Sequence, residues 1–164
     1  MSRLQDQVLT VRRARGEDAE SVGRVHRSAI RGLCRTHYTD EQIEAWSGPR
    51  PQGRFEKAIS EREFYVAERE GEVVGFGNLD REAGEVEAVY VAPDAAGRGV
   101  GMKLLRTVEA RARELGIKSL SVDASLNAVG FYERAGFVLR ATGAHRLWNG
   151  VDLPCAHMSK ELAD

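Results

Sequence analysis

The first quarter of the chain combines a short alternating segment with a longer segment of helical periodicity. Residues Val8 to Arg13 alternate weakly between apolar and polar and predict a first strand. Gly16, Glu17 and Asp18 then form a helix start, with acidic side chains at its positive end. The helix that follows has apolar residues at helical spacing, with His26 on the same face: Val22, Val25, Ala29, Ile30 and Leu33.

A second, shorter helix is indicated by its cap. Thr39 precedes the helical segment Asp40 to Trp46, and Gln42 stands three residues after the threonine, the spacing of a capping box. The next segment, 47–53, holds two prolines and two glycines and predicts a loop. One or two further helical turns are expected over 54–60.

The middle of the chain predicts three antiparallel strands, over 64–68, 73–79 and 85–91, separated by turns. Gly75 and Gly77 interrupt the central strand, so they indicate a bulge or a ligand that approaches the backbone closely.

The clearest helix lies after residue 99 and stops at Gly116, with one apolar stripe formed by Val100, Leu104, Leu105, Val108, Ala112 and Leu115. A strand over 119–124, a short helix that carries Tyr132, and strands near 137–142 and 153–159 complete the order. The sum predicts an α+β fold, a mixed sheet of six or seven strands with helices on both faces.

Composition limits the partners. A chain of 164 residues with 42% apolar content fits one domain, 1–164, and 24 basic residues against 25 acidic ones give no field that favours nucleic acid or an anionic membrane. The first ten residues lack the features of an export signal, and no apolar stretch approaches the roughly 20 residues of a membrane span, so we expect a cytoplasmic protein. Cys34, Cys155 and the four histidines show no metal spacing. We expect small-molecule partners and no metal.

A candidate anion site lies between the third of these strands and the clearest helix. Residues 89–101, VYVAPDAAGRGVG, pass from a strand through a turn into three glycines, Gly97, Gly99 and Gly101, with Arg98 beside them. Glycines let a ligand approach the main chain, and the helix start adds free N–H donors, so a pyrophosphate would fit. Leu104 replaces the third glycine of a dinucleotide fingerprint, and the pattern fits a triphosphate loop no better. Taken alone, the segment is equally well a plain turn.

A second motif gives the loop a context. Residues 123–137, DASLNAVGFYERAGF, contain Ala128, Phe131, Tyr132, Glu133, Gly136 and Phe137. Together, the two segments resemble the GNAT superfamily of N-acetyltransferases, over about residues 8–161. The resemblance implies a mostly antiparallel sheet, a loop that binds the pyrophosphate of acetyl-CoA, a preceding strand that pairs with the pantetheine arm, and a tyrosine beside the thioester sulfur.

The cofactor residues that the resemblance implies here are Val89, Val91, Gly97, Arg98, Gly99, Val100, Gly101, Met102, Asn127, Tyr132 and Arg134. The chain departs from the family at Ala96, where Gln or Arg is usual, and at Ser125, where Asn is frequent. Asn127 is a candidate to replace the second of these contacts. A homodimer is also typical of the family.

Acetyl transfer to an amine needs a base, because an amine of pKa near 10 is mostly protonated at neutral pH. Glu85 and Glu87 stand two apart on a strand, which places both on one face together with Val89 and Val91. If that face lines the cleft, one of the two acids should have a raised pKa. The alternative is that both are ordinary solvated residues near a turn.

Tyr132 is the candidate acid for the leaving thiolate, since a phenol is protonated at pH 7, and its alternative role is a core residue bonded to backbone. A main-chain N–H near Val89 or Val91 would polarise the carbonyl. Cys34 or Cys155 as an acetyl carrier is less favoured, with His157 as the weak hint of a base.

The acceptor pocket is expected where aromatic and polar groups gather, at His26, His37, Tyr38, Trp46 and Trp148. Tyr38, Thr39, Gln42 and Trp46 also resemble a segment of a bacterial GNAT subgroup, a likeness that implies no substrate. We take His26, Tyr38 and Trp46 as candidate substrate contacts. A hydrogen-bonded core histidine and a packing tryptophan are the alternatives for His26 and Trp46.

The main hypothesis is an acetyl-CoA-dependent N-acetyltransferase that acts on a primary amine of a small molecule or peptide by direct attack in a ternary complex. The alternative from another class is a non-catalytic module that binds acyl-CoA and regulates a partner. A third hypothesis is an acyltransferase that transfers a longer or different acyl group. The size of the pocket near Gly75 and Gly77 would decide between acetyl and such a group.

Overall fold

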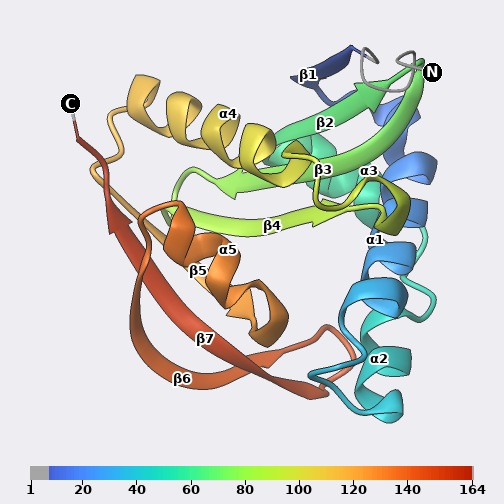
Figure 1. Cartoon of the computed structure of the whole chain (residues 1–164). Helices are drawn as coiled ribbons and strands as arrows, with labels where there is room; N and C mark the ends of the chain where they lie inside the picture. Colours follow the sequence, from blue (N-terminus) through green and yellow to red (C-terminus); the bar gives the residue numbers. More distant parts are fainter. Residues whose placement is uncertain (1–7, 164) are drawn as a thin grey trace, which may run out of the picture.

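Seven strands form a single mixed sheet in the part of the chain that the structure describes. A computed structural model describes residues 8–163, and the sheet has the order β1-β2-β3-β4-β5-β7-β6 (Figure 1). The strands are β1 Leu9–Arg13, β2 Glu63–Arg69, β3 Glu72–Asp80, β4 Glu85–Val91, β5 Ser119–Ser125, β6 Val138–Arg146 and β7 Asp152–Glu161. Residues 1–7, part of the segment from which the sequence predicts no export signal, lie outside the described residues together with residue 164.

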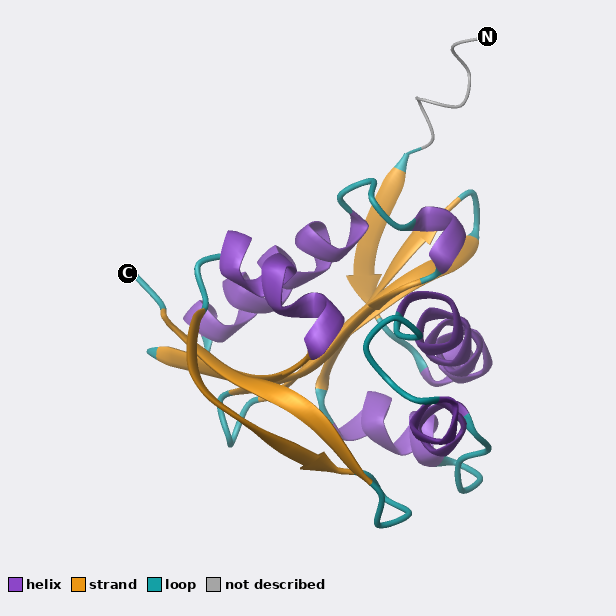
Figure 2. Cartoon of the chain, turned by 60° about the horizontal axis from the view of Figure 1, so that its bottom comes forward, coloured by secondary structure: helices purple, strands orange, loops and turns teal. Residues whose placement is uncertain are grey.

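Helices cover both faces of this sheet (Figure 2). The α-helices are α1 Ala19–Leu33, α2 Asp40–Ser47, α3 Arg54–Glu61, α4 Val100–Glu114 and α5 Val129–Arg134, and the 3-10 turns are η1 Gly16–Asp18, η2 Pro93–Ala95 and η3 Leu126–Ala128. Helix α4 buries its apolar stripe on one face, while α1 and α3 pack on the other. The α+β prediction of a mixed, mostly antiparallel sheet between helices is confirmed.

The pairing of β4 with β5 is the feature that opens the sheet. All neighbouring strands are antiparallel except these two, which run parallel and pair only at Glu85 with Ser121 and Val86 with Val122. Beyond Val86 they diverge, and the β1–β4 part of the sheet spreads away from the β5–β7–β6 part (Figure 1). Beyond Val86, the edge of β4 that faces β5 therefore has no strand partner among the described residues.

Local sequence signals account for the helix ends. Thr39 Oγ1 accepts a hydrogen bond from the Gln42 amide at 3.1 Å, and the Gln42 side chain accepts one from the Thr39 amide at 2.9 Å, so the predicted capping box is confirmed. Gly116 follows α4 with a φ of +78° and ends it, as expected. Of the apolar stripe predicted for α1, Leu33 alone is exposed, because it lies at the helix end.

A bulge in β4 overturns one expectation about side-chain direction. Asn78 pairs with Ala88 but Leu79 pairs with Val86, so Glu87 is an extra residue in β4. The bulge reverses the alternation, because one inserted residue turns every later side chain to the other face. Glu85 and Glu87 point to the α1 and α3 side, whereas Val89 packs toward α4. The two glutamates share one face, as predicted, but the prediction that Val89 and Val91 lie on that face with them is wrong.

The glycines of β3 have an expected role and a further one. Ala67 pairs with Gly75 but Glu68 pairs with Val73, so β3 has a bulge next to Gly75, as the sequence indicates. A Cβ on Gly75 would lie 3.0 Å from the Tyr90 carbonyl oxygen and 3.1 Å from Leu104 Cδ1. Gly77 likewise lies under α4, and both glycines are buried. They let α4 approach the sheet, so they do not line an acyl pocket.

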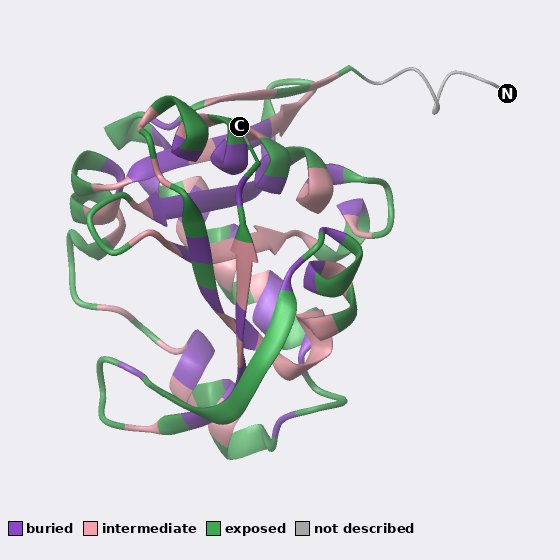
Figure 3. Ribbon diagram, turned by 90° about the vertical axis from the view of Figure 1, so that its left-hand side faces the viewer, coloured by how far each residue is buried: buried purple, intermediate pink, exposed green. Residues whose placement is uncertain are grey.

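Burial separates the last two strands. Every residue of β6 is exposed, while β7 buries Leu153, Cys155, Ala156 and Met158 (Figure 3). Strand β6 is thus an edge strand whose outer side faces solvent, and β7 completes the core. Within the described residues, no helix has the length and apolar character needed to cross a membrane.

Candidate active site

The predicted glycine loop forms one wall of a cleft of about 700 Å³ beside β4. Helix α5 and the end of α1 form the other walls. Of the predicted cofactor residues, those that line this cleft are Val89, Val91, Gly97, Gly99, Val100, Gly101, Met102, Asn127 and Arg134. Arg98 is exposed on the loop outside the lining, and Tyr132 lies in a neighbouring cavity.

The loop has the backbone geometry of an anion cradle. Gly97 and Gly99 have φ angles of +75° and +81°, and a Cβ on either would meet no atom within 4 Å. Gly99 is the N-cap of α4, and the first hydrogen bond of the helix runs from the Lys103 amide to the Gly99 carbonyl at 3.1 Å. The amides of residues 100–102 precede that bond, so they have no partner within the helix. This helix start can therefore hold an anion.

The third glycine of the loop serves packing. A Cβ on Gly101 would lie 3.2 Å from Phe131 Cε2, so the absence of a side chain lets α4 and α5 touch across the end of the cleft. Asn127 adds a polar group to the same wall, and its Oδ1 is buried without a hydrogen-bond partner. A buried acceptor of this kind is rare in a folded protein unless a ligand satisfies it.

Tyr132 lies where β4 and β5 diverge. Its ring packs edge-on against Phe131 and Phe137, with centroid distances of 5.0 and 5.4 Å, and the residue is only 4% exposed. Burial raises the pKa of Tyr132 well above its ordinary value, so the phenol stays protonated.

A small cavity of about 80 Å³ beside Tyr132 adjoins two larger spaces. It shares Val89 and Ser125 with the wall of the large cleft. It shares Glu85 and Glu87 with a third cavity of about 400 Å³ on the α1 and α3 side of the sheet. The tyrosine therefore lies between a cleft lined by backbone and a cavity lined by charged side chains.

The two candidate bases differ in their partners. Glu87 Oε1 accepts hydrogen bonds from Arg62 Nε at 2.6 Å and from Asn78 Nδ2 at 3.1 Å. Glu85 is half-buried, and its pKa is raised by burial, with smaller contributions from Asp123 and Glu87. The expectation that one of the two acids has a raised pKa is confirmed for Glu85.

The three candidate substrate contacts lie close together, but they differ in how firmly hydrogen bonds and packing hold their side chains. The Tyr38 hydroxyl donates to the Pro154 carbonyl at 2.7 Å and accepts from the Leu126 amide at 3.0 Å, which ties the α1–α2 connection to β7. Trp46 is 6% exposed and packs edge-on against Tyr38. Both lie at the cavity walls as structural anchors.

His26 faces the 400 Å³ cavity between two aromatic rings, Phe55 and Tyr90, at centroid distances of 5.6 and 5.2 Å. Its Nε2 lies 3.4 Å from Arg50 Nη2. Burial and then the charges of Arg50 and Arg54 lower the pKa of His26 to about 3, so the ring is neutral at physiological pH. His37 is exposed and lines the large cleft rather than this cavity.

Several cavity residues escaped the sequence analysis. Arg50 comes from a segment that the sequence predicts as a plain loop, and His145 lies beyond the predicted end of its strand. Asp123 Oδ2 lies 3.1 Å from His145 Nδ1, and Asp123 Oδ1 lies 2.6 Å from His157 Nδ1. Burial alone would raise the pKa of Asp123, but the hydrogen bonds with the two histidines hold it below its usual value.

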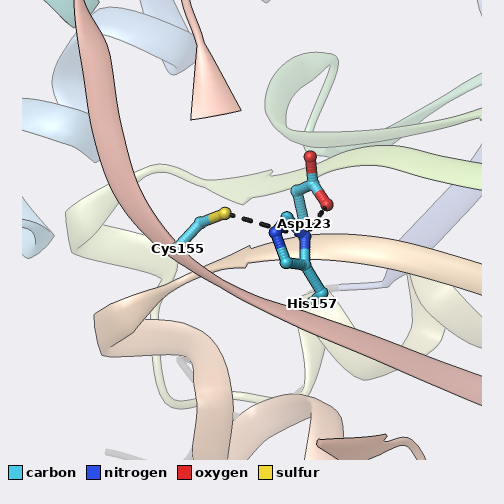
Figure 4. A group of neighbouring side chains, drawn as sticks. All are labelled: Asp123, Cys155 and His157. Carbon is cyan, nitrogen blue, oxygen red and sulfur yellow. Dashed lines mark hydrogen bonds and ion pairs between the residues drawn. The ribbon is translucent and has the colours of Figure 1, made fainter. Parts of the chain in front are cut away.

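Cys155 approaches this group but lacks a base. Its Sγ is 4.0 Å from His157 Nδ1, the nitrogen that already faces Asp123 (Figure 4). Burial and the nearby Asp123 raise the pKa of Cys155 to about 11, so the thiol is neutral and a poor nucleophile. Ligand atoms of the three residues, Asp123, Cys155 and His157, lie within 4.8 Å of one another, a grouping that the sequence spacing does not indicate. The absence of a metal stays a prediction.

Comparisons with known proteins give the same picture as the geometry. A family model described as an acetyltransferase (GNAT) domain matches residues 34–162. An uncharacterized N-acetyltransferase of Escherichia coli, YafP, is 27% identical over 129 residues, which cover 79% of this chain and 81% of that protein.

Two solved structures are similar over nearly the whole chain. A GCN5-related N-acetyltransferase from Rhodopseudomonas palustris has a TM-score of 0.87 and 31% identity, covering 93% of this chain and 95% of that one. The PaiA N-acetyltransferase of Thermoplasma acidophilum, solved in complex with coenzyme A, has a TM-score of 0.76 and 24% identity, covering 94% and 99%. The second likeness establishes the fold alone.

Proposed function

Because the chain belongs to the GNAT superfamily of acetyltransferases, we propose that it transfers an acetyl group from acetyl-CoA to a primary amine of a small molecule or peptide, by direct attack in a ternary complex. One observation carries the proposal: the Tyr132 cavity adjoins both the cleft beside the glycine loop and the acid-lined cavity. A donor in the first space and an amine in the second would meet at this tyrosine.

The large cleft fits acetyl-CoA, which supplies an activated thioester when bound. Main-chain amides around Gly97 and Gly99 would hold its pyrophosphate, and the exposed side chains of Arg98 and Arg134 would add positive charge. The unpaired edge of β4 offers N–H and C=O groups to an amide-containing arm, as a neighbouring strand would. Asn127 Oδ1 is a further acceptor for an amide of that arm.

Glu85 is proposed as the base. It lines the cavity on the acceptor side, and it is not held by a guanidinium as Glu87 is. A raised pKa brings the pKa of Glu85 closer to that of the amine whose proton it must accept, which favours general base catalysis. In the transfer, the C–N bond forms as the C–S bond breaks, and Glu85 takes the proton that the attacking nitrogen loses.

Tyr132 is proposed to act on the leaving sulfur. The strongly raised pKa of Tyr132 makes loss of its proton unfavourable. Its role is therefore to donate a hydrogen bond from its O–H to the sulfur as negative charge develops there. The sequence predicts an acid for the leaving thiolate, whereas the raised pKa of Tyr132 favours a hydrogen bond without full proton transfer. Burial disfavours the charged phenolate, and a hydrogen bond to the sulfur does not require the phenolate to form.

The Tyr132→Phe variant tests this assignment. It removes one oxygen from a buried ring, so we expect kcat to fall by about 10²-fold while the Kd for coenzyme A stays unchanged. Thiol release measures kcat, and calorimetry measures the Kd. Tyr65→Phe, on β2 away from the three cavities, is the matched control.

The same assay separates the rival function. A regulatory module would bind coenzyme A but release no thiol with any amine, in the parent protein as in the variant. If the parent protein releases thiol and Tyr132→Phe does so at the same rate, the role of the tyrosine is wrong although the enzyme assignment stands. The homodimer and the acyl-chain length stay predictions.

A further inference from the structure

The acceptor cavity contains a guanidinium that the fold leaves without an anion. Arg50 Nη2 donates to the Trp46 carbonyl oxygen at 2.6 Å and lies 3.4 Å from His26 Nε2. Its Nε and Nη1 atoms are buried, and neither has a hydrogen-bond partner. A buried donor without a partner loses its hydration and gains nothing in return, so such atoms need an explanation.

Other half-buried arginines of the described chain show the contrast. Arg12 contacts Asp18 at 2.9 Å, Arg62 contacts Glu87 at 2.6 Å, and Arg111 contacts Glu63 at 3.2 Å. For Arg50, by comparison, no carboxylate of residues 8–163 lies within ion-pair distance. These three arginines each have a carboxylate partner, whereas Arg50 has two buried N–H groups that a partner from outside the chain could satisfy.

Arg50 lies at the wall of two spaces. Arg50 and Arg54 line the 400 Å³ cavity together with Glu85, the proposed base, and they also line a space of about 480 Å³ between α1 and α3 that Glu85 does not reach. Of the two, the first combines the arginines with the proposed base. The neighbouring ring of His26 is neutral, so it is not a counterion for Arg50. The cavity therefore has a cationic region and an acidic one, and a ligand that carries both an anion and an amine would match both.

Trp148 covers this guanidinium from the turn between β6 and β7. Its ring centroid is 5.7 Å from Arg50 Cζ, and 46% of the residue is exposed. An aromatic ring contacts the flat face of a guanidinium. The N–H bonds of the guanidinium lie in its plane, so they stay free to donate hydrogen bonds.

From this arrangement we propose that the acceptor is a small amino-carboxylate, whose carboxylate binds the free N–H groups of Arg50 while its amine lies at Glu85. The inference rests on the proposed acetyl transfer and narrows its acceptor. Guanidinium and carboxylate form strong charge-assisted hydrogen bonds, which would satisfy the unpartnered atoms. Polyamines and aminoglycosides are excluded as preferred acceptors, because Arg50 and Arg54 repel a polycation.

The first test compares free amino acids with their primary amides, which keep the amine and the side chain but lose the negative charge. Thiol release from acetyl-CoA should give a kcat/KM for the preferred acid that is roughly 10- to 100-fold higher than for its amide. Equal values for acid and amide, or a polyamine as the better acceptor, would overturn the proposal.

The second test uses Arg50→Gln, with Arg24→Gln as the control on the exposed side of α1. Arg50→Gln should raise the KM for the acid by the same roughly 10- to 100-fold and leave the KM values for the amide and acetyl-CoA unchanged. Because it removes a buried charge without a counterion, its thermal midpoint should stay the same or rise. A lower midpoint with equal losses for acid and amide would show that Arg50 is only structural.

A binding titration keeps the inference separate from the activity. Without acetyl-CoA, an acid that binds Arg50 should change the tryptophan fluorescence, which comes from Trp46 and Trp148 at the cavity walls, whereas its amide should not. Arg50→Lys, which keeps the charge, should retain part of the response if Arg50→Gln does not fold. If no amine releases thiol, the proposed transfer fails, and this titration still decides whether the cavity selects carboxylates. Identical titration curves for acid and amide would overturn the selection itself.

Discussion

The cleft beside the glycine loop and the cavity beneath α1 and α3 are built in opposite ways. The cleft is formed by main chain and by apolar side chains, with Gly97 and Gly99 leaving open space for a ligand. The cavity is lined by charged side chains, including half-buried Arg50 and Glu85 and exposed Glu87. The two spaces lie on either side of the point where β4 and β5 diverge.

The difference reflects what each space has to recognise. A main-chain cradle can hold any pyrophosphate and depends little on individual side chains, which suits a donor shared by a whole family. An array of buried charges costs desolvation free energy unless each charge finds a partner, and it is selective for the ligand that supplies the missing partner. The acceptor side should therefore be the side where single side chains matter most.

The largest effect is expected for Glu85→Gln. The substitution removes the proposed base with little change in shape, so kcat should fall by about 10²- to 10⁴-fold while the Kd for coenzyme A is unchanged. Since burial raises the pKa of Glu85, activity in the parent protein should decline with falling pH at a higher pH than for an ordinary glutamate. The pH profile of kcat/KM measures this acidic limb, which the variant should lack.

Two carboxylates serve as comparisons for that result. Glu82→Gln changes an exposed residue in the turn before β4 and should leave the pH profile unchanged. Glu87→Gln removes the partner of Arg62 and should have the smaller catalytic effect. If Glu87→Gln abolishes the acidic limb and Glu85→Gln keeps it, the two roles must be exchanged.

The contrast also explains which parts of the molecule the sequence could predict. The glycine loop and the Tyr132 helix are contiguous segments, and their residue types determine their local backbone, so both could be located. Strands and helices followed from periodicity in the same way. The bulge at Glu87 could not be seen, because one extra residue leaves the composition of β4 unchanged while it redirects Val89 and Val91.

The acceptor cavity was harder to predict because its walls come from distant segments. Arg50 lies in a loop with proline and glycine that reads as solvated, yet α1 and the β6–β7 turn bury its side chain. Strand β6 continues to Arg146, four residues past the predicted end, and this carries His145 to Asp123. Such contacts depend on tertiary packing, for which a single sequence gives no periodic signal.

The second largest effect is expected for the pH dependence of the free energy of unfolding, through His26 at the cavity wall. A histidine of ordinary pKa near 6.5 in the unfolded chain, lowered to about 3 by burial and by Arg50 in the folded state, takes up its proton only on unfolding. Its contribution to stability is present above pH 6.5 and is lost as the pH falls toward 3. Between pH 7 and pH 5 the free energy of unfolding should drop by up to about 2 kcal/mol through His26.

Urea denaturation of the parent protein and of His26→Gln at these two pH values measures that contribution. The variant has no ring to protonate, so its free energy of unfolding should depend less on pH by about the same amount. An identical pH dependence in both proteins would show that the ring takes up a proton in the folded state, and that the cavity tolerates a further positive charge.

The smallest effect separates the cradle from the strain that builds it. Gly99 and Gly116 stand at opposite ends of α4 with φ angles of +81° and +78°, and a Cβ on either meets no atom within 4 Å. Alanine at either position should therefore cost a similar free energy of unfolding, about 1 to 2 kcal/mol, because the left-handed conformation disfavours any side chain. Gly99 lines the cleft, whereas Gly116 does not.

The Kd for coenzyme A should thus rise about tenfold in Gly99→Ala and stay unchanged in Gly116→Ala, although both variants lose similar stability in urea. Calorimetry measures the first quantity on folded protein, so the two effects can be separated. Equal affinities in both variants would show that the ligand does not approach the main chain at Gly99. In that case the cleft would depend on its side chains as the acceptor cavity does, and the distinction between the two spaces would be lost.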